Sequence, residues 1–343
     1  MKSTQIRLAA RPVGEPRDED FEFVSTDLGE LEDGQVLLRT VYLSLDPYMR
    51  GRMSAAKSYA KPVEVGDVMV GGTVCEVVES RSPRRDVGDL VLAYTGWQTY
   101  AVVDVKATRR LDPAAAPIST ALGVLGMPGF TAYAGLLEIG RPKPGETVVV
   151  AAASGPVGSA VGQIAKAKGA RAVGIAGGPE KCRALLEEFG FDVAVDHRSP
   201  TFTDDLANAT PDGVDVYFEN VAGPVGAAVV GRLNKFARVP VCGLVANYNA
   251  TGAPEGTDHL PGFLNSILRL SLTVRGFIQD EFLPTHHDDF LRDMTGWVAD
   301  GSVRYREDVV DGLEQTPEAF RGLLVGRNFG KLLVRVGDDP TRA

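Results

Sequence analysis

A run of small residues between two regular segments carries the clearest chemistry in this sequence. Thr147–Gly162 reads TVVVAAASGPVGSAVG. Its β-branched start predicts a buried strand, and Ser159–Lys168 has the pattern of a helix. Glycines between them let the backbone turn tightly and let a phosphate approach, and the free N–H groups at a helix start favour an anion. The run therefore predicts a dinucleotide-binding loop whose contacts are Gly155, Pro156, Val157 and Gly158.

The same pattern also occurs in ordinary tight turns between a strand and a helix. Here Ala153 takes the first glycine position of the dinucleotide fingerprint, which weakens the motif taken alone. A second predicted strand and helix follow at the expected distance, and this context favours the dinucleotide.

The second strand indicates which dinucleotide is bound. NAD sites usually place Asp or Glu near the end of this strand, but after Ala172–Ile175 the chain reads Ala176-Gly-Gly-Pro179. Lys181 follows in the next helix, and His197 and Arg198 follow the third predicted strand. Because neighbouring parallel strands end at one edge of the sheet, the three cationic side chains are expected around the 2′-phosphate of NADP.

Two features weigh against this choice of cofactor. Glu180 and Asp196 place negative charge near the expected phosphate. Lys181 taken alone would be an ordinary solvated lysine in the first turn of a helix. The missing acid combined with three cations still favours NADPH over NADH.

From about residue 122 the chain alternates between predicted strands and helices, which indicates an α/β fold with a doubly wound parallel sheet. The predicted strands are Thr147–Ala152, Ala172–Ile175, Val193–Val195, Val214–Phe218, Arg238–Cys242 and Leu272–Phe277, with Asp288–Asp300 as the closing helix. Earlier residues form short alternating runs, such as Gln35–Thr40 and Leu90–Ala93, which predict a mostly-β domain. A last predicted strand, Lys331–Val336, is expected to pack back on that domain.

Composition limits the partners and the compartment. The 343 residues are 44% hydrophobic and 24% charged, as in ordinary globular proteins, and the length suits two domains. A net charge of −9 argues against a nucleic-acid partner. No apolar run reaches membrane length and no signal peptide is evident. Three distant cysteines, Cys75, Cys182 and Cys242, suit a reducing compartment, so the cytoplasm is the expected location.

Several motifs together resemble one family. These are LDPYMRGRM at 45–53, GMPGFTAY at 126–133, the loop and helix at 152–168, DVYFENV at 215–221, Cys242-Gly243 with Tyr248-Asn249, and RNFGK at 327–331. They resemble the medium-chain dehydrogenase/reductase superfamily, in particular its zinc-free, NADPH-dependent double-bond reductases of the prostaglandin, alkenal and curcumin reductase kind. The resemblance implies a GroES-like domain, residues 1–122 and 303–343, split around a Rossmann domain, residues 123–302. It also implies a homodimer, for which Leu272–Phe277 is the expected edge strand.

The resemblance also implies roles for individual residues. Tyr248 is expected to donate a hydrogen bond to the substrate oxygen, and Tyr48 to line the substrate pocket. The further cofactor contacts that it implies are Met127, Thr131, Asn220, Cys242, Gly243, Tyr248, Phe277 and Asn328. The alternatives are core packing for Met127 and Phe277, and a loop tyrosine covering apolar surface for Tyr248.

Three positions depart from the family pattern. His197 stands where an aromatic hydroxyl is usual, Glu219 where Asp is usual, and Ala222 where Gly is usual. His197 can still donate to a phosphate, and does so more strongly when protonated. The preference for NADP is therefore expected to depend on pH.

A catalytic zinc site needs three side-chain ligands, and this sequence lacks them. Leu45, Asp46 and Pro47 occupy the region of the first ligand, and no Gly-His-Glu follows Gly71-Gly72. None of the four histidines pairs with a cysteine at zinc spacing, and His286-His287 are interpreted as solvated residues before the closing helix. We therefore expect no metal.

Without a Lewis acid, such a site suits hydride addition to an alkene that a carbonyl group already activates. The predicted reaction is reduction of the C=C bond of an enone or enal, with the enolate stabilised by a neutral hydrogen-bond donor, Tyr248. Two alternatives remain open, an NADPH-dependent quinone oxidoreductase and a non-catalytic NADPH-binding protein. The loops around Ala55–Val65 and Ala250–Leu264, interpreted as mobile covers, do not identify the substrate.

Overall fold

The computed structural model describes residues 1–252 and 258–342, and the chain divides into two compact units. The β unit consists of Met1–Leu122 and Glu307–Ala343, and the Rossmann unit of Gly123–Arg306. The Rossmann unit thus ends at Arg306, not at residue 302. Of the expected cover Ala250–Leu264, residues 253–257 lie outside the described residues. No helix within the described ranges is long and apolar enough to cross a membrane.

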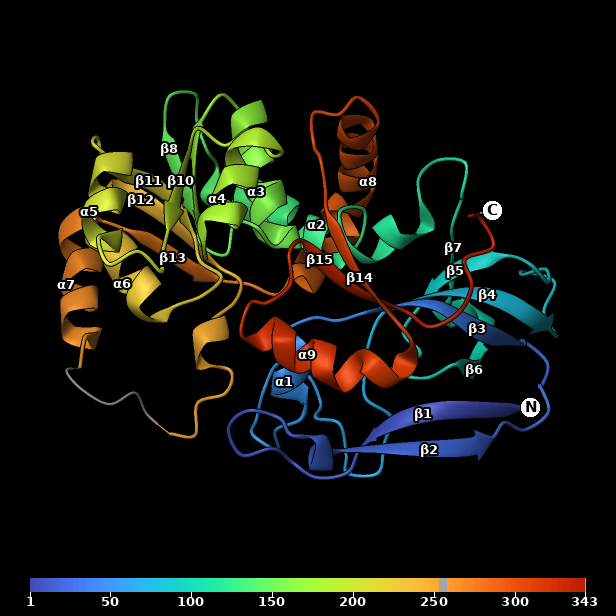
Figure 1. Ribbon diagram of the computed structural model, residues 1–343. Coiled ribbons are helices and arrows are strands. Elements are labelled where there is room, and N and C mark those ends of the chain that lie inside the picture. The colour runs from blue at the N-terminus through green and yellow to red at the C-terminus, as the bar shows by residue number, and fades with distance from the viewer. Residues whose placement is uncertain (253–257, 343) are drawn as a thin grey trace. The chain divides into compact units, whose positions relative to one another are not determined.

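The β unit contains a two-stranded and a seven-stranded sheet within the described residues (Figure 1). The strands β1 (Lys2–Leu8) and β2 (Phe21–Asp27) form the antiparallel pair. The larger sheet runs β14-β15-β3-β4-β5-β7, and β6 also pairs with β3. Its strands are β3 (Gln35–Ser44), β4 (Thr73–Ser80), β5 (Leu90–Ala93), β6 (Tyr100–Asp104), β7 (Arg109–Arg110), β14 (Glu307–Asp311) and β15 (Lys331–Arg335).

Short helices complete the β unit. These are η1 (Asp18–Asp20), α1 (Tyr48–Arg52), η2 (Val105–Ala107), η3 (Ile118–Leu122), η7 (Leu313–Gln315) and α9 (Thr316–Leu324). The fully buried Trp97 stacks on Phe21 and meets Phe320 of α9 edge-on, each at 5.5 Å between ring centroids. A tryptophan buried among aromatic rings contributes both apolar area and favourable ring geometry. This core therefore joins α9, near the end of the chain, to β2, near its start.

The Rossmann unit has a six-stranded parallel sheet in the order β10-β9-β8-β11-β12-β13 within the described residues. Its strands are β8 (Thr147–Val150), β9 (Arg171–Ala176), β10 (Val193–Asp196), β11 (Val214–Phe218), β12 (Leu233–Val241) and β13 (Thr273–Gly276). The predicted fold class is confirmed: the chain has a doubly wound parallel sheet and a separate mostly-β part. All four residues of β8 are buried, as expected of a central strand whose two faces are both covered.

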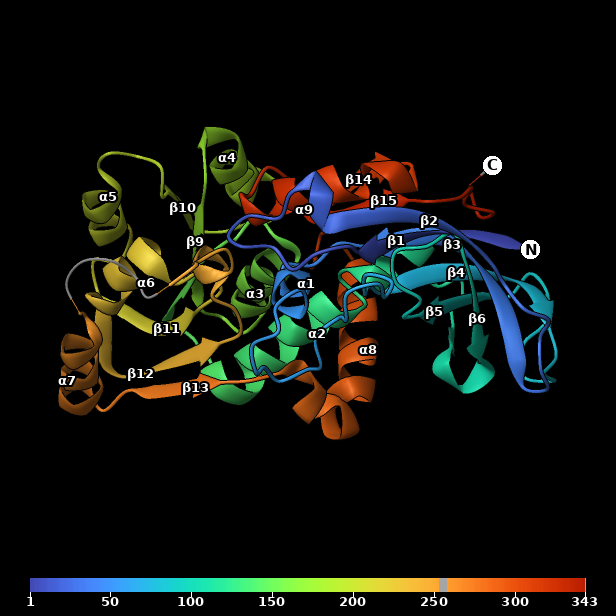
Figure 2. The ribbon, with the colours of Figure 1, turned by 90° about the horizontal axis from the view of Figure 1, so that it is seen from below.

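Helices cover both faces of this sheet (Figure 2). On one face lie α5 (Phe202–Ala209), α6 (Gly223–Val230) and α7 (Leu260–Leu270), whose apolar side chains pack with Val149, Val173 and Val239. On the other lie α3 (Pro156–Ala167) and α4 (Pro179–Glu187). The remaining helices of the unit are α2 (Met127–Ala134), η4 (Gly135–Gly140), η5 (Val245–Asn247), η6 (Gln279–Phe282) and α8 (Leu283–Ala299).

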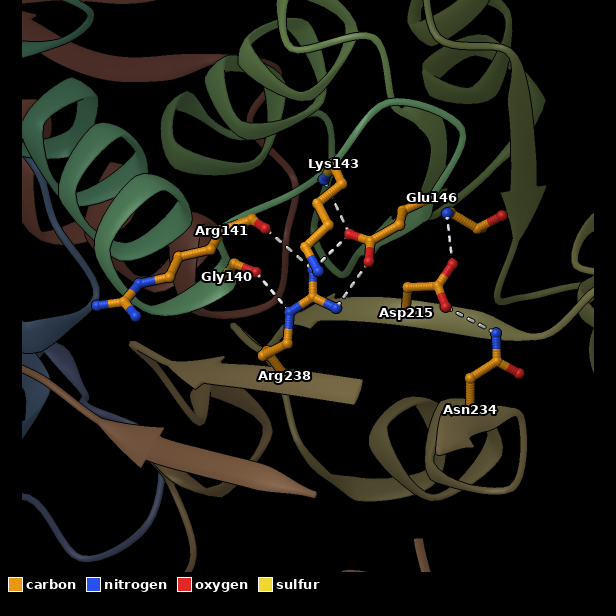
Figure 3. A network of polar contacts seen from close by, with 8 residues as sticks. Gly140, Arg141, Lys143, Glu146, Asp215, Asn234 and Arg238 are labelled. Atoms are coloured by element: carbon orange, nitrogen blue, oxygen red, sulfur yellow. Dashed lines mark hydrogen bonds and ion pairs between the residues drawn. The ribbon is translucent and has the colours of Figure 1, made fainter. Parts of the chain in front are cut away.

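The segment η4 is a π-helix that continues α2 and is fixed at both of its ends. Gly135 lies so close to Phe277 and Phe218 that a Cβ there would be 2.3 Å from the Phe277 ring. At the other end, Arg238 donates to the carbonyl oxygens of Gly140 and Arg141 and pairs with Glu146 (Figure 3). The guanidinium thus satisfies carbonyls that a helix end leaves without partners.

The structure corrects two element boundaries. The helix α8 begins at Leu283, five residues before the predicted start, so His286 and His287 lie inside it. His286 lies 3.0 Å from Glu138 Oε1, and His287 packs edge-on against Phe130, so neither is a merely solvated residue ahead of a helix. The strand β12 begins at Leu233, not Arg238, because an irregular register keeps its first residues beside β11.

Replacing Gly135 with Ala should destabilise the protein by about 1–3 kcal/mol, because the added methyl must displace buried aromatic rings. Gly296, in α8, has no atom within 4 Å of the place that an added methyl group would take, so Gly296→Ala is the matched control. That control should stabilise the protein by roughly 0.5–1 kcal/mol, since alanine favours a helix interior. Urea unfolding followed by circular dichroism measures both. Equal effects of the two substitutions would contradict the close packing at Gly135.

Candidate active site

The carboxyl ends of six parallel strands meet at one edge of the Rossmann sheet, and the candidate site is built there. The strand order reverses between β8 and β11, the place where open α/β sheets bind ligands. The residues that follow these strands are the glycine loop after β8, Gly177 after β9, His197 after β10, Glu219 and Asn220 after β11, Cys242 and Gly243 after β12, and Phe277 after β13.

The glycine loop has the geometry of an anion-binding turn. Ala152 has φ +51°, and the Ala153 amide donates to Ile175 O at 2.9 Å, which ties the loop to β9. Gly155 is the N-cap of α3 and Pro156 is its first residue, so Val157 and Gly158 present their amides at the helix start. A Cβ at Gly158 would be 2.5 Å from Ala152 O, so only glycine allows the helix this close to the loop.

The end of β9 is covered by two side chains from the end of β10. A Cβ at Gly177 would lie 2.8 Å from His197 Nε2 and 2.9 Å from Arg198 Nε. The position where a carboxylate would select NAD is thus occupied by the imidazole and guanidinium groups. The structure brings His197 and Arg198 together over Gly177 and places Lys181 in the first turn of α4.

Asp196, whose carboxylate accepts hydrogen bonds from backbone amides, adds a negative charge beside His197 and Arg198. Asp196 Oδ1 accepts from the amides of Gly178 (2.8 Å) and Arg198 (2.9 Å). Desolvation opposes ionisation, but these hydrogen bonds prevail and lower the pKa of Asp196. Desolvation and the nearby Arg198 charge lower the pKa of His197 from 6.5, with Asp196 opposing. His197 is therefore neutral at pH 7 in the free protein.

Asn220 joins three neighbouring strand ends. Its Nδ2 donates to Ala151 O at 2.7 Å, and its Oδ1 accepts from the Cys242 thiol at 2.7 Å. Desolvation and the charge of Glu219 raise the pKa of Cys242, which keeps it a thiol. Both ends of the Asn220 amide are therefore used within the protein, across the point where the strand order reverses.

Tyr248 lies beside the end of β12. It follows η5, and its hydroxyl is 3.5 Å from the position that a Cβ at Gly243 would take. Gly243 thus leaves room for the phenol at the edge where β11 and β12 end.

The other candidates of this unit have mainly structural contacts. Thr131 Oγ1 donates to Met127 O at 2.8 Å, which holds the first turn of α2. Phe277 is 6% exposed and packs against Phe218 and Phe282, while its amide donates to Val241 O. The ring of Phe277 therefore belongs to the core.

In the β unit, a buried ion pair joins two of the sequence motifs. Lys331 Nζ lies 2.8 Å from Asp46 Oδ1 and donates to Leu45 O at 2.7 Å. Ser44 donates to the other oxygen of Asp46. The pair fixes the turn that starts α1, whose first residue is Tyr48. Burial, then the Asp46 charge, raises the pKa of Tyr48, so its phenol stays protonated.

Asn328 follows α9 in the same motif as Lys331. Its Nδ2 donates to Gly330 O at 2.8 Å, which shapes the loop before β15. Asn328 and Tyr48 belong to the β unit, while the other candidate residues belong to the Rossmann unit.

Two carboxylates, Asp46 and Glu219, are only 5% and 7% exposed, and the sequence did not lead us to expect either of them to be buried and bonded. A signal was available, since both lie in motifs singled out from the sequence, and a charged residue inside an apolar run usually has a buried partner. Among residues 1–252 and 258–342, no three His, Cys, Asp or Glu side chains gather where they could hold a metal ion.

Comparisons with known proteins match this chain to oxidoreductases. Residues 4–111 match the family described as "N-terminal domain of oxidoreductase", and residues 156–286 match "Zinc-binding dehydrogenase". The chain is 54% identical to NADPH-dependent curcumin reductase of Escherichia coli (strain K12), covering 97% of this chain and 96% of that protein. It is 40% identical to prostaglandin reductase 1 of Sus scrofa, covering 94% and 96%. The crystal structure of CurA in complex with NADPH from Vibrio vulnificus is 50% identical, with a TM-score of 0.94 over 98% of this chain and 100% of that one.

Lys331→Met should destabilise the protein by about 3–5 kcal/mol, because it leaves Asp46 as an uncompensated buried charge. The double variant Asp46→Leu with Lys331→Met should recover most of the loss, since an apolar pair leaves no charge buried. Guanidinium unfolding of both variants checks this. If the double variant is no more stable than Lys331→Met, the ion pair is not what holds this turn.

Proposed function

The chain belongs to the zinc-free, double-bond-reducing group of the medium-chain dehydrogenase/reductase family, and we propose that it reduces the C=C bond of α,β-unsaturated ketones and aldehydes with NADPH. The curated relatives include an NADPH-dependent curcumin reductase and prostaglandin reductases, and the chain covers nearly the whole length of each. The substrates named for these relatives support an enone as the substrate class of this chain.

NADPH is the cofactor, and the residues of the Rossmann unit fit it. The amides at the start of α3 fit the pyrophosphate, and Gly158 allows the close approach of loop and helix that such a site needs. His197 and Arg198 over Gly177, with Lys181 in α4, fit the 2′-phosphate, which needs charged hydrogen-bond donors. Asp196, bonded to two amides, orders the turn that carries two of these donors.

When bound, NADPH supplies the hydride. The residues of the chain then have to stabilise the negative charge that develops on the substrate oxygen as its β-carbon is reduced. A phenol fits this role, because its ordinary pKa of about 10 keeps it protonated and able to donate at neutral pH. We assign this hydrogen bond to Tyr248. Tyr48 remains the candidate from the β unit for lining the substrate pocket.

One observation carries the assignment of Tyr248. Its hydroxyl lies beside Gly243, at the carboxyl edge of the sheet and next to the reversal in strand order. A donor at this edge is where an oxygen of a reacting substrate would need one.

Product analysis tests the reaction. With NADPH and a simple enone, the expected product is the saturated ketone. Tyr248→Phe should raise the activation free energy by up to about 2.7–4 kcal/mol, because one preorganised donor is lost. This corresponds to a roughly 100- to 1,000-fold lower kcat. NADPH affinity should stay nearly unchanged. Tyr100→Phe, which removes a phenol hydroxyl from β6, is the control and should keep full turnover. An allylic alcohol, or turnover of quinones alone, would sink the proposal.

Lys181→Ala should weaken NADPH binding about tenfold or more and leave NADH binding nearly unchanged, since a hydrogen bond to a charged group contributes on the order of 1.5–3 kcal/mol. Lys235→Ala removes the same charge from the opposite, amino-terminal half of β12 and should change neither affinity. Fluorescence titration with both dinucleotides measures the four constants. An equal loss for NADPH and NADH would exclude contact with the 2′-phosphate.

NADPH affinity should rise as the pH falls from 8 toward 6, and NADH affinity should not. In the free protein the pKa of His197 lies below 6.5, and a bound phosphate dianion should raise it, so binding takes up a proton within this window. Each pKa unit gained contributes about 1.4 kcal/mol, roughly tenfold in affinity. Below about pH 6 the phosphate itself takes up a proton and the gain ends. The same titration with His197→Gln should show a flat profile, and an unchanged slope would rule out His197.

A further inference from the structure

The turn that joins β11 to α6 holds an alanine in a backbone conformation that favours glycine. Ala222 has φ +67° and ψ −154°, and Gly223 follows with φ +59°. A non-glycine residue in this region costs on the order of 1–3 kcal/mol, and it persists only where surrounding contacts impose it. The strained turn lies at the carboxyl edge of the sheet, within the candidate site.

A buried carboxylate bonds to this turn. Glu219 Oε1 accepts from the amides of Val221 at 2.7 Å and Ala222 at 2.9 Å. Its other oxygen faces Gly226 in the first turn of α6, where a Cβ would be 2.6 Å away. The glutamate therefore bonds to the strained peptide itself and also lies at the start of a helix, where a negative charge is favoured.

The strained turn in turn holds the segment that leads to Tyr248. The Val245 amide donates to Asn220 O at 3.2 Å, and the Ala246 amide donates to Val221 O at 3.0 Å. These carbonyls belong to the same two peptides whose N–H groups bond to Glu219. One turn further, the Tyr248 amide donates to Val245 O at 3.2 Å.

The same two segments also meet before the turn. The amides of Cys242 and Gly243 donate to Glu219 O, at 3.0 and 3.3 Å. Residues 219–221 and 242–246 are therefore bonded along their length. A change of direction at Ala222 would rotate the carbonyls of 220 and 221 away from these amides.

We propose that Glu219 is a positioning residue for Tyr248: its carboxylate keeps the turn at Ala222 in the strained conformation that docks residues 245–248. The inference rests on the proposed role of Tyr248 in the reaction. The role of Glu219 is to hold the turn, without contact to substrate or cofactor. Without the carboxylate, Ala222 relaxes to an ordinary φ, the two carbonyls turn, and the phenol loses its place beside Gly243.

A double-mutant cycle tests the proposal. Glu219→Ala should lower kcat roughly 10- to 100-fold, as displacement of a catalytic group by about an ångström does. The Kd for NADPH should change less than about threefold, since the glycine loop is untouched. Adding Ala222→Gly should restore most of kcat, because glycine adopts the turn without strain and no longer needs the carboxylate. Glu219→Gln, which keeps the acceptor oxygen, should also retain most of kcat.

A control separates positioning from general loss of stability. Glu146→Ala removes a carboxylate from the opposite edge of the same unit, where it pairs with Arg238, and should lower Tm while leaving kcat unchanged. Hydrogen exchange supplies a readout independent of activity: the amides of 245 and 246 should exchange faster in Glu219→Ala and return to the wild-type rate in the double variant.

Three results would overturn the proposal. They are an unchanged kcat in Glu219→Ala, a double variant no better than Glu219→Ala, or equal losses of kcat in Glu219→Ala and Glu146→Ala. If the wild-type protein reduces no enone, the proposed function fails, and the exchange rates of residues 245 and 246 still decide whether Glu219 holds the segment.

Discussion

All six strands of the Rossmann unit run in one direction, and this constraint determines where every candidate group can lie. Parallel strands bring their carboxyl ends to one edge, so short loops from distant parts of the sequence converge there. The side chain of Asn220 links three of these strand ends directly. It donates a hydrogen bond to Ala151 O and accepts one from the Cys242 thiol. The ends of β8, β11 and β12 are thereby held as one surface, and the glycine loop, His197 with Arg198, and Tyr248 are arranged around it.

The two edges of the sheet use polar groups differently. At the amino edge, Arg238 pairs with Glu146, and both residues and Asp215 bond to main-chain groups that close helix and strand ends (Figure 3). At the carboxyl edge, Ala152 and Ala222 have positive φ, and the carboxylate of Glu219 is buried. Positive φ also occurs near the amino ends of strands, at Phe236 and Ser271, so the carboxyl edge differs by the buried carboxylate that bonds to the Ala222 amide.

Much of the fold was predictable from the sequence, because buried parallel strands read as short β-branched runs. All six strands of the Rossmann unit coincide with such runs, and the glycine loop fell where Gly155 and Gly158 indicated. The start of β12 was missed because Asn234 and Lys235 are polar and Phe236 has φ +66°, a bulge that no strand periodicity describes. The start of α8 differs from the prediction because the predicted helix began at Asp288, although Pro284 favours a first helical turn.

The candidate site was less predictable than the sheet. His197 and Arg198 could be placed from the sequence, because residues that directly follow a parallel strand lie at its carboxyl end. The bonds of Glu219 and Asn220 were not predictable, because each depends on the direction of one side chain. The pairing of Asp46 with Lys331, 285 residues later, cannot be predicted from any local sequence pattern.

That separation has a consequence for how the polypeptide is made. The Rossmann unit is one continuous stretch, so all of its strands have left the ribosome before β15 is synthesised. The β unit has no such freedom, because β15 lies between β14 and β3 and brings the lysine that neutralises Asp46. At 5–20 residues per second, β3 waits on the order of ten seconds or more for its neighbour. During that interval the nascent chain exposes an open sheet edge and an unpaired carboxylate, so the first domain to begin synthesis is the last to fold.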